Sequence, residues 1–308
     1  MRITSNTIFH QLTADINRSA NRLFELQRQV ASSKRMATAS DDPIGAGLAV
    51  SLHESLAQLL QAQRNADQAE ARLQASQGVL TDILSELGDV KDLAFRGVDG
   101  ALTDSDRQNL ATQVNQKLEQ LLADANARSI DGYLFGGTQT SVAPFTATRN
   151  ANGDITAVSA NSLGTGIAGQ VDASLPSGLT VVVNVPGSTV LTSTSPQTVD
   201  IFPLLIAVRD QLRAGNVAGV ELNLTNLDTA VDQVRVVSAD VGSRIGRIRD
   251  IQQRSQSDLL TLRGRLSKIE DTDIAEASIE FQQAQNVYQA ALAAASKVVQ
   301  INLIDFLR

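Results

Sequence analysis

Apolar residues recur at alternating spacings of three and four along much of this chain, which is the pattern of helices that pack along a seam. The longest series is unbroken from residue 224 to residue 269, and eleven of its fourteen positions are apolar. Its members are Leu224, Leu227, Val231, Val234, Ser238, Val241, Ile245, Ile248, Gln252, Ser255, Leu259, Leu262, Leu266 and Ile269. The series predicts one long helix, in which the polar Gln252 and Ser255 set the register or permit a bend.

A second series of apolar residues recurs every seven residues from 52 to 94. A further set of positions between its members completes the apolar face of the predicted helix. Its members are Leu52, Leu59, Ala66, Leu73, Leu80, Leu87 and Ala94, with Ser55, Ala62, Ala69, Ser76, Ile83 and Val90 between them. A third helix is predicted over about residues 105–127, and Thr103 with Asp106 resembles a capping box at its start. We expect this helix to lie antiparallel to the second series, with the 224–269 rod alongside.

Both ends of the chain carry the same three-four spacing. The N-terminal seam holds Phe9, Leu12, Ile16, Ser19, Leu23, Leu26 and Val30, and the C-terminal seam holds Ala277, Phe281, Ala284, Tyr288, Ala291, Ala295 and Val298. Residues 1–35 carry a net charge of +4 and residues 265–308 a net charge of −2, which favours pairing of the two ends. Because these seams bury few large side chains, we expect them to fold fully only when neighbouring chains cover their outer faces. The predicted assembly interface is Phe9, Leu12, Ile16, Leu23, Leu26, Val30, Phe281, Tyr288, Val298 and Ile301.

The composition changes abruptly between residues 138 and 199. This stretch has only three charged residues but four of the six prolines, and Asn152-Gly153 lies between two runs that favour strands. Residues 179–185 are rich in Val, as a buried strand would be. We interpret the stretch as a small inserted β domain; the alternative is a disordered loop rich in Ser and Thr. A short helix over Ile201–Arg213 then leads back to the rods, with Gly215 as its C-cap.

These patterns together predict a mainly α fold of long antiparallel coiled-coil rods, built from both ends of the chain, with a small inserted β domain. The expected divisions are a terminal assembly helix over residues 1–40 paired with 270–308, a rod domain over 41–137 paired with 200–269, and the β domain over 138–199.

Composition narrows the possible functions. The chain has no Cys and only two His, His10 and His53, which lie on different predicted helices, so neither a thiolate nucleophile nor a histidine-rich metal site is expected. Its net charge of −7 argues against sequence-independent binding to nucleic acid. No apolar run approaches the roughly 20 residues of a membrane span, and the start of the chain does not resemble a cleaved signal peptide. We therefore expect no catalytic, cofactor or metal site, and no stable membrane insertion.

Two acidic segments are better explained by helix starts than by chemistry. Ser40-Asp41-Asp42-Pro43 is typical of a helix N-terminus, with Ser40 or an aspartate as the cap and Pro43 in the first position. Glu270-Asp271-Thr272-Asp273 lacks the spacing and the glycine of a calcium loop, so we expect a turn before the last helix, with Thr272 and Glu276 in its cap.

Several segments resemble those of the flagellin-like family of bacterial flagellar axial proteins, in particular its hook–filament junction type. The chain has Ser33 where that family usually has Gly. The segments that carry the resemblance are Met1-Arg2-Ile3-Thr4 with Phe9, Leu26–Arg35, Ser40-Asp41-Asp42-Pro43, Ala125-Asn126, Gly132-Tyr133-Leu134-Phe135-Gly136-Gly137-Thr138, Pro144-Phe145, Leu266–Ala277 and Leu303–Leu307.

The resemblance implies an extracellular structural protein of the flagellum, exported by the flagellar type III pathway without a cleaved signal. It further implies a homo-oligomer in a ring or helical layer, with hook-associated protein 1 and flagellin as neighbours. An export chaperone would bind the last helix through Phe281, Tyr288, Val298 and Ile301. The nearest alternative is flagellin itself, and a more distant one is a secreted helical toxin that acts on membranes.

Overall fold

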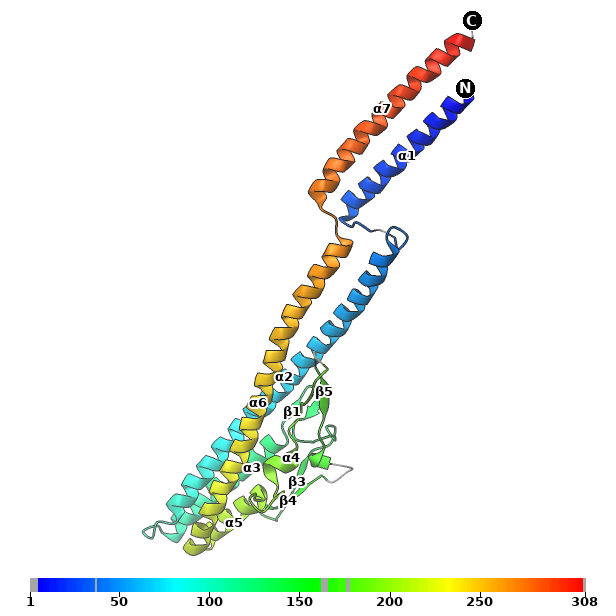
Figure 1. Cartoon of the computed structure of the whole chain (residues 1–308). Helices are drawn as coiled ribbons and strands as arrows, with labels where there is room; N and C mark the ends of the chain where they lie inside the picture. Colours follow the sequence, from blue (N-terminus) through cyan, green and yellow to red (C-terminus); the bar gives the residue numbers. More distant parts are fainter. Residues whose placement is uncertain (1–4, 37, 162–165, 176–177, 307–308) are drawn as a thin grey trace. The chain divides into compact units, whose positions relative to one another are not determined.

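The computed structural model describes residues 5–36, 38–161, 166–175 and 178–306, with the side chains of residues 10–297 inside these ranges. The N-terminal part holds three long helices, α1 (Ser5–Ser32), α2 (Pro43–Gly97) and α3 (Asp104–Ala125). The C-terminal part holds α5 (Ile201–Arg213), α6 (Val217–Glu270) and α7 (Ile274–Phe306). The fold is therefore mainly helical, with long helices from both ends of the chain packed together, which confirms the predicted class (Figure 1).

The chain forms two compact units. One comprises residues 1–58 and 257–308, and we call it the terminal unit; the other comprises residues 59–256, and we call it the core unit. Both α2 and α6 pass from one unit into the other. The expected division after residue 40 lies in the connection between α1 and α2, and the one at residue 270 lies at the last residue of α6.

An antiparallel pair of α2 and α6 forms the spine of the core unit (Figure 1). Three polar contacts along the pair show that the two helices are antiparallel. Lys91 pairs with Asp228, Gln77 Nε2 donates to Ser238 Oγ at 2.6 Å, and Arg249 Nε donates to Glu70 Oε1 at 2.7 Å. As the residue number falls along α2, it rises along α6. All fourteen positions of the series from 224 to 269 are buried or half-buried, as the heptad pattern predicts.

The polar seam residues of α6 differ in their contacts. Gln252 Nε2 donates to Asp67 Oδ1 at 2.8 Å, which is a further polar contact between α6 and α2. Ser255 is buried, and its hydroxyl has no hydrogen-bond partner within the described part of the chain. On α2, Ser55 is exposed although its place in the series predicts burial.

Helix α3 packs on α2 through Lys117, whose Nζ lies 2.6 Å from Asp89 Oδ2 and 3.2 Å from Glu86 Oε2. The capping box at its start is confirmed: Thr103 Oγ1 accepts from Asp106 N at 3.2 Å, and Asp106 Oδ2 accepts from Thr103 N at 3.1 Å. Helix α5 has the predicted bounds, although its C-cap is Ala214 and Gly215 follows with a φ of +65°.

Within its described residues, the inserted region contains three two-stranded antiparallel sheets, which argues against a disordered loop. These pair β1 (Arg128–Ser129) with β2 (Gly132–Tyr133), β3 (Phe145–Arg149) with β4 (Ile155–Ala160), and β5 (Asp172–Ser174) with β6 (Thr180–Val182). The β3–β4 hairpin turns at Asn152-Gly153 as predicted, and Gly153 has a φ of +87°, which an L side chain rarely adopts. The region also holds a 3₁₀ turn, η1 (Gly166–Ala168), and a short helix, α4 (Gly187–Leu191). The predicted strand over 179–185 is shorter, and the first sheet begins ten residues before the expected boundary.

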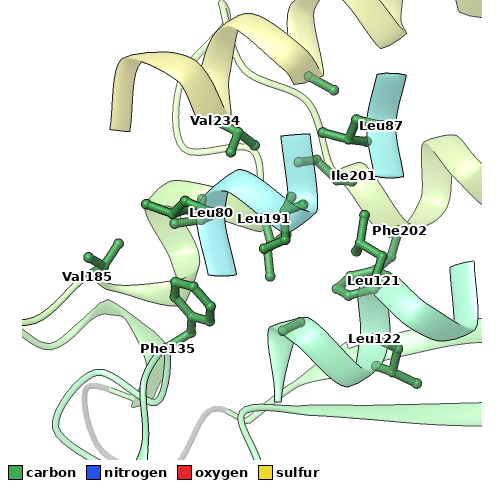
Figure 2. Close-up of a cluster of buried hydrophobic side chains, with 14 of the residues drawn as sticks. Leu80, Leu87, Leu121, Leu122, Phe135, Val185, Leu191, Ile201, Phe202 and Val234 are labelled. Carbon is green, nitrogen blue, oxygen red and sulfur yellow. The ribbon is translucent and has the colours of Figure 1, made fainter. Parts of the chain in front are cut away.

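One hydrophobic core joins the insertion to the helices. Figure 2 shows Leu80 and Leu87 of α2, Leu121 and Leu122 of α3, Leu191 of α4, Ile201 and Phe202 of α5, and Val234 of α6 converging with Phe135 and Val185. Asn126 fastens the region at its base, because its side chain donates to Phe145 O at 2.9 Å and accepts from Phe145 N at 3.0 Å. Two of the segments that carry the family resemblance, Ala125-Asn126 and Pro144-Phe145, are therefore hydrogen-bonded to each other.

Candidate assembly site

Helices α1 and α7 form an antiparallel pair in the terminal unit (Figure 1). Arg22 Nη2 lies 2.8 Å from Glu280 Oε2, and Lys34, beyond the end of α1, lies 3.1 Å from Asp271 Oδ1, before the start of α7. Higher residue numbers on α1 thus meet lower numbers on α7. The basic N-terminal segment and the acidic C-terminal segment pair as their charges favour.

The predicted seam residues occupy the facing sides of this pair. Leu26 is 2% exposed, and the other described members are half-buried, namely Leu12, Ile16, Leu23, Val30, Phe281 and Tyr288. The side chains of Phe9, Val298 and Ile301 lie outside the described residues. The structure thus brings the described seam residues together within one chain.

This pair has much less of a core than the α2–α6 spine. Among the described side chains of α1 and α7, only Leu26 and Ala277 are buried. The C-terminal seam is rich in Ala, which removes little apolar surface from water on packing. Large parts of both helices therefore face solvent in the single chain.

Sequence reasoning missed the apolar residues that lie off the seams. Phe24 is 66% exposed on α1, and α7 exposes Ile274, Ile279, Val287 and Leu292. Phe24 directly follows Leu23, so it lies about 100° around the helix from the seam. A signal was available in the sequence: Phe24, one of only eight Phe in the chain, stands at a position that the heptad pattern predicts to face solvent.

A groove runs between α1 and α7, with a volume of about 540 Å³. Leu26, Ala284 and Val287 contribute apolar atoms to it, whereas charged and polar side chains of both helices border it. The lining residues are Arg18, Ser19, Arg22, Leu26, Glu280, Gln283, Ala284 and Val287. An apolar groove with polar borders can accept the apolar face of another helix.

The connection between α1 and α2 is bound to the turn between α6 and α7 by backbone hydrogen bonds. Arg35 N donates to Glu270 O at 2.6 Å, and Thr272 N donates to Ser33 O at 3.2 Å. The Arg35 guanidinium also donates to Ile269 O at 2.9 Å and so satisfies a carbonyl at the end of α6. We call this set of contacts, with the side chains described next, the junction.

A cluster of charges covers the junction. Glu270 Oε2 accepts from Lys34 Nζ at 2.5 Å, and Glu270 Oε1 lies 2.7 Å from His53 Nε2. The Lys34 ammonium lowers the pKa of the Glu270 carboxyl, His53 lowers it further, and burial opposes both. Reciprocally, Glu270 and then Asp271 raise the pKa of Lys34. His53 therefore has a hydrogen-bond partner from a distant part of the chain, which its position in the sequence did not indicate.

The junction also contains a strained residue. Ser33 has a φ of +57°, and it is the one non-glycine residue with a positive φ in the described part of the chain. This is the left-handed conformation, which glycine adopts without steric cost. The position at which the family usually has Gly is therefore one where the backbone favours it.

The helix starts that flank the junction are capped by aspartates. Asp42 Oδ1 accepts from Gly45 N at 2.9 Å and Pro43 is the first residue of α2, while the Ser40 hydroxyl lies 3.0 Å from that of Thr38 instead. At the start of α7, Asp273 Oδ1 accepts from Ala275 N at 2.9 Å and from Glu276 N at 3.3 Å. Within the expected cap region from Thr272 to Glu276, the capping residue is Asp273, because it stands directly before the first helical residue.

Neither a cluster of metal ligands nor a membrane-spanning helix occurs among the described residues. They contain no group of three or more His, Asp or Glu side chains that could hold a metal ion. Within the same residues, no helix has a stretch long and apolar enough to cross a bilayer.

Two family models match the chain at its ends. Residues 3–140 match the bacterial flagellin N-terminal helical region, and residues 224–307 match the bacterial flagellin C-terminal helical region. The flagellar hook-associated protein 3 of Salmonella typhimurium is 25% identical over 295 residues, which cover 89% of each chain. Phase 1 flagellin of Salmonella naestved is 26% identical over 130 residues, which cover 42% of this chain and 26% of that protein.

Solved structures have the same fold. The Xanthomonas campestris FlgL structure matches with a TM-score of 0.60 at 15% identity, over 70% of this chain and 99% of that one. The flagellar junction protein FlgL from Legionella pneumophila matches with a TM-score of 0.58 at 15% identity, over 73% of this chain and all of that one.

Replacing Ser33 by Gly should stabilise the terminal unit by about 0.5–1 kcal/mol. Relief of the left-handed strain, roughly 1–2 kcal/mol, exceeds the extra chain entropy of Gly in the unfolded state. Ala14→Gly is the matched control; Ala14 is exposed in the interior of α1, so the change should cost about 1 kcal/mol. Hydrogen exchange of the α1 amides measures both, and equal loss of protection in the two variants would contradict the assignment.

Stability of the terminal unit should depend on pH through Glu270. Its pKa is below the ordinary 4.5, so its stabilising effect is present above that pH and is lost as the pH falls through the folded pKa. The pKa of Lys34 is above the ordinary 10.5, so its effect is present below that pH and is lost at more alkaline pH. The difference in melting temperature between the natural chain and Glu270→Gln should therefore be largest between these limits and shrink in acid.

Circular dichroism melts across this pH range provide the measurement. Glu276→Gln is the control, because Glu276 is exposed and makes no ion pair among the described residues. A constant difference down to about pH 2 for Glu270→Gln would refute the role of the carboxylate.

Proposed function

Because this chain belongs to the flagellin family and, within it, to the hook-associated proteins 3 of the flagellar hook–filament junction, we propose that its paired terminal helices carry its assembly into that junction. The family makes it an extracellular structural component of the flagellum rather than an enzyme. The resemblance found in the sequence is thereby confirmed.

One observation carries the proposal: α1 and α7 pair with each other but bury only two described side chains between them. The exposed apolar residues of this pair remain in water unless a neighbouring chain covers them. Covering them would offset the conformational entropy of ordering two long helices, so that folding and assembly support each other.

The two units would then divide the mechanical work. The α2–α6 spine and its large core give the subunit stiffness, because they bury side chains along the whole helix pair. The terminal pair supplies contacts to other copies in a ring or helical layer. We infer hook-associated protein 1 on one side of that layer and flagellin on the other, which suits a joint between a flexible hook and a stiff filament.

Flagellin is the alternative role within the same family. The fraction of each relative's length that the chain matches favours the junction role over flagellin. The Salmonella hook-associated protein 3 is matched over 89% of its length, and the flagellin over 26%. A membrane-active toxin is disfavoured, since the described part of the chain contains no helix apolar enough to span a membrane.

The proposal predicts that Leu23→Asp abolishes incorporation into the flagellum while the core unit stays folded. Leu23 is half-buried in the terminal pair and lies outside the core unit. Losing the burial of one Leu, about 1.5–3 kcal/mol, corresponds to a factor of roughly 10–100 in association. Quantitative immunoblotting of isolated flagella measures incorporation, and hydrogen exchange of residues 59–256 reports the core unit.

Ala14→Asp is the matched control, because it adds the same charge at an exposed position of α1. It should incorporate at close to the natural level. Normal incorporation of Leu23→Asp, or loss of incorporation through unfolding of the core unit, would count against the proposal.

We further propose that an export chaperone binds α7 through Phe281, Tyr288, Val298 and Ile301 before secretion. A chain that ends at Glu270 should lose this binding in a pull-down, whereas a chain that lacks residues 1–32 should keep it. Undiminished binding by the chain that ends at Glu270 would eliminate α7 as the chaperone site.

A further inference from the structure

We propose that Phe24 of one copy of this chain packs into the groove between α1 and α7 of the next copy. The inference rests on the proposed function and assigns the contact through which the terminal pairs associate. Its occupant is a second copy of this chain, and the two halves of the contact lie on opposite sides of the same helix pair.

The placement of Phe24 supports this geometry. Arg22 and Leu26 line the groove, and Phe24 lies midway between them in sequence. At about 100° per residue, Phe24 is some 200° around α1 from either one. Phe24 therefore projects away from the groove of its own chain, and its 66% exposure leaves it free to enter another.

The groove fits an aromatic side chain in size and lining. Its volume of about 540 Å³ is within the range of pockets that enclose drug-sized ligands, so a phenyl ring and side chains from the same helix face can enter it. Leu26, Ala284 and Val287 would contact the ring, and Gln283 lies at the border. The small Ala284 lets a neighbouring helix approach closely.

Charge agrees with the same arrangement. Arg28 follows Phe24 by one helical turn on the same face of α1, and the ion pair that it makes among the described residues is long, 3.5 Å from its Nη2 to Asp41 Oδ2. Glu276 precedes Glu280 by one turn along the groove side of α7, and it has no ion-pair partner among the described residues. In a neighbouring copy whose α1 runs parallel, Arg28 would approach Glu276 as Phe24 enters the groove.

A contact between two different faces is heterologous, so it repeats from copy to copy instead of closing into a dimer. Such contacts generate rings or helical layers, which are the assemblies that a hook–filament junction requires. A contact of Phe24 with Phe24 would instead give a closed two-fold dimer.

Cysteine cross-linking tests the contact directly, because the chain has no Cys of its own. Phe24→Cys and Val287→Cys are made in separate full-length chains and expressed together in cells without the natural chain. Isolated flagella are treated with a short bismaleimide, and cross-linked dimers are resolved on gels. Leu292→Cys replaces Val287→Cys as the control, since Leu292 is also exposed on α7 but lies about 140° around the helix from Val287.

We expect the Phe24–Val287 pair to give at least about five-fold more dimer than the Phe24–Leu292 pair or either variant alone. A dominant Phe24–Phe24 dimer, equal yields for both pairs, or no dimer in assembled flagella would each overturn the contact. Incorporation of Phe24→Ser separates this inference from the proposed function: normal incorporation of Phe24→Ser with loss of Leu23→Asp refutes the Phe24 contact alone. Normal incorporation of both variants refutes the proposed function as well.

Discussion

The antiparallel seam between α2 and α6 is the constraint on which the rest of the subunit depends. The two helices are far apart in sequence, and their apolar stripes meet only if the intervening chain returns to the same end of the pair. Helices α3 and α5 and the inserted strands make that return, and their side chains fill the core beside the seam (Figure 2). The β region is thus packed into the core unit, and Phe135 is buried among the helices although it belongs to a short connecting segment.

The terminal unit obeys a different balance. Its helices carry the same three-four spacing, but the facing residues include many Ala and few large side chains. Their pairing draws on charge complementarity, as in the Arg22–Glu280 pair, and exposed ion pairs contribute little to stability in water. The surface left uncovered on α1 and α7 is the one that we propose for assembly.

The junction shows how local chemistry fixes where the terminal helices begin and end. Aspartate caps start α2 and α7, the Arg35 side chain closes the end of α6, and Glu270 joins Lys34 to His53. The segment also keeps a left-handed Ser33, whose strain these hydrogen bonds and ion pairs hold in place. A strained connection between well-capped helices defines the chain path without a hydrophobic core of its own.

The sequence by itself determined the helices, the insertion and the family, because heptad spacing, capping boxes and hairpin turns depend on residues close together in the chain. Helix α5 and the β3–β4 turn fall where these local signals place them. The heptad spacing already places Leu23 on the seam and Phe24 off it, whereas tertiary structure alone decided how much of the other apolar surface of α1 and α7 stays exposed. It also decided that His53 meets Glu270 and that Asn126 binds Phe145, since these partners are brought together only when distant segments pack. The candidate assembly groove belongs to this second class, because it exists only between two helices from opposite ends of the chain.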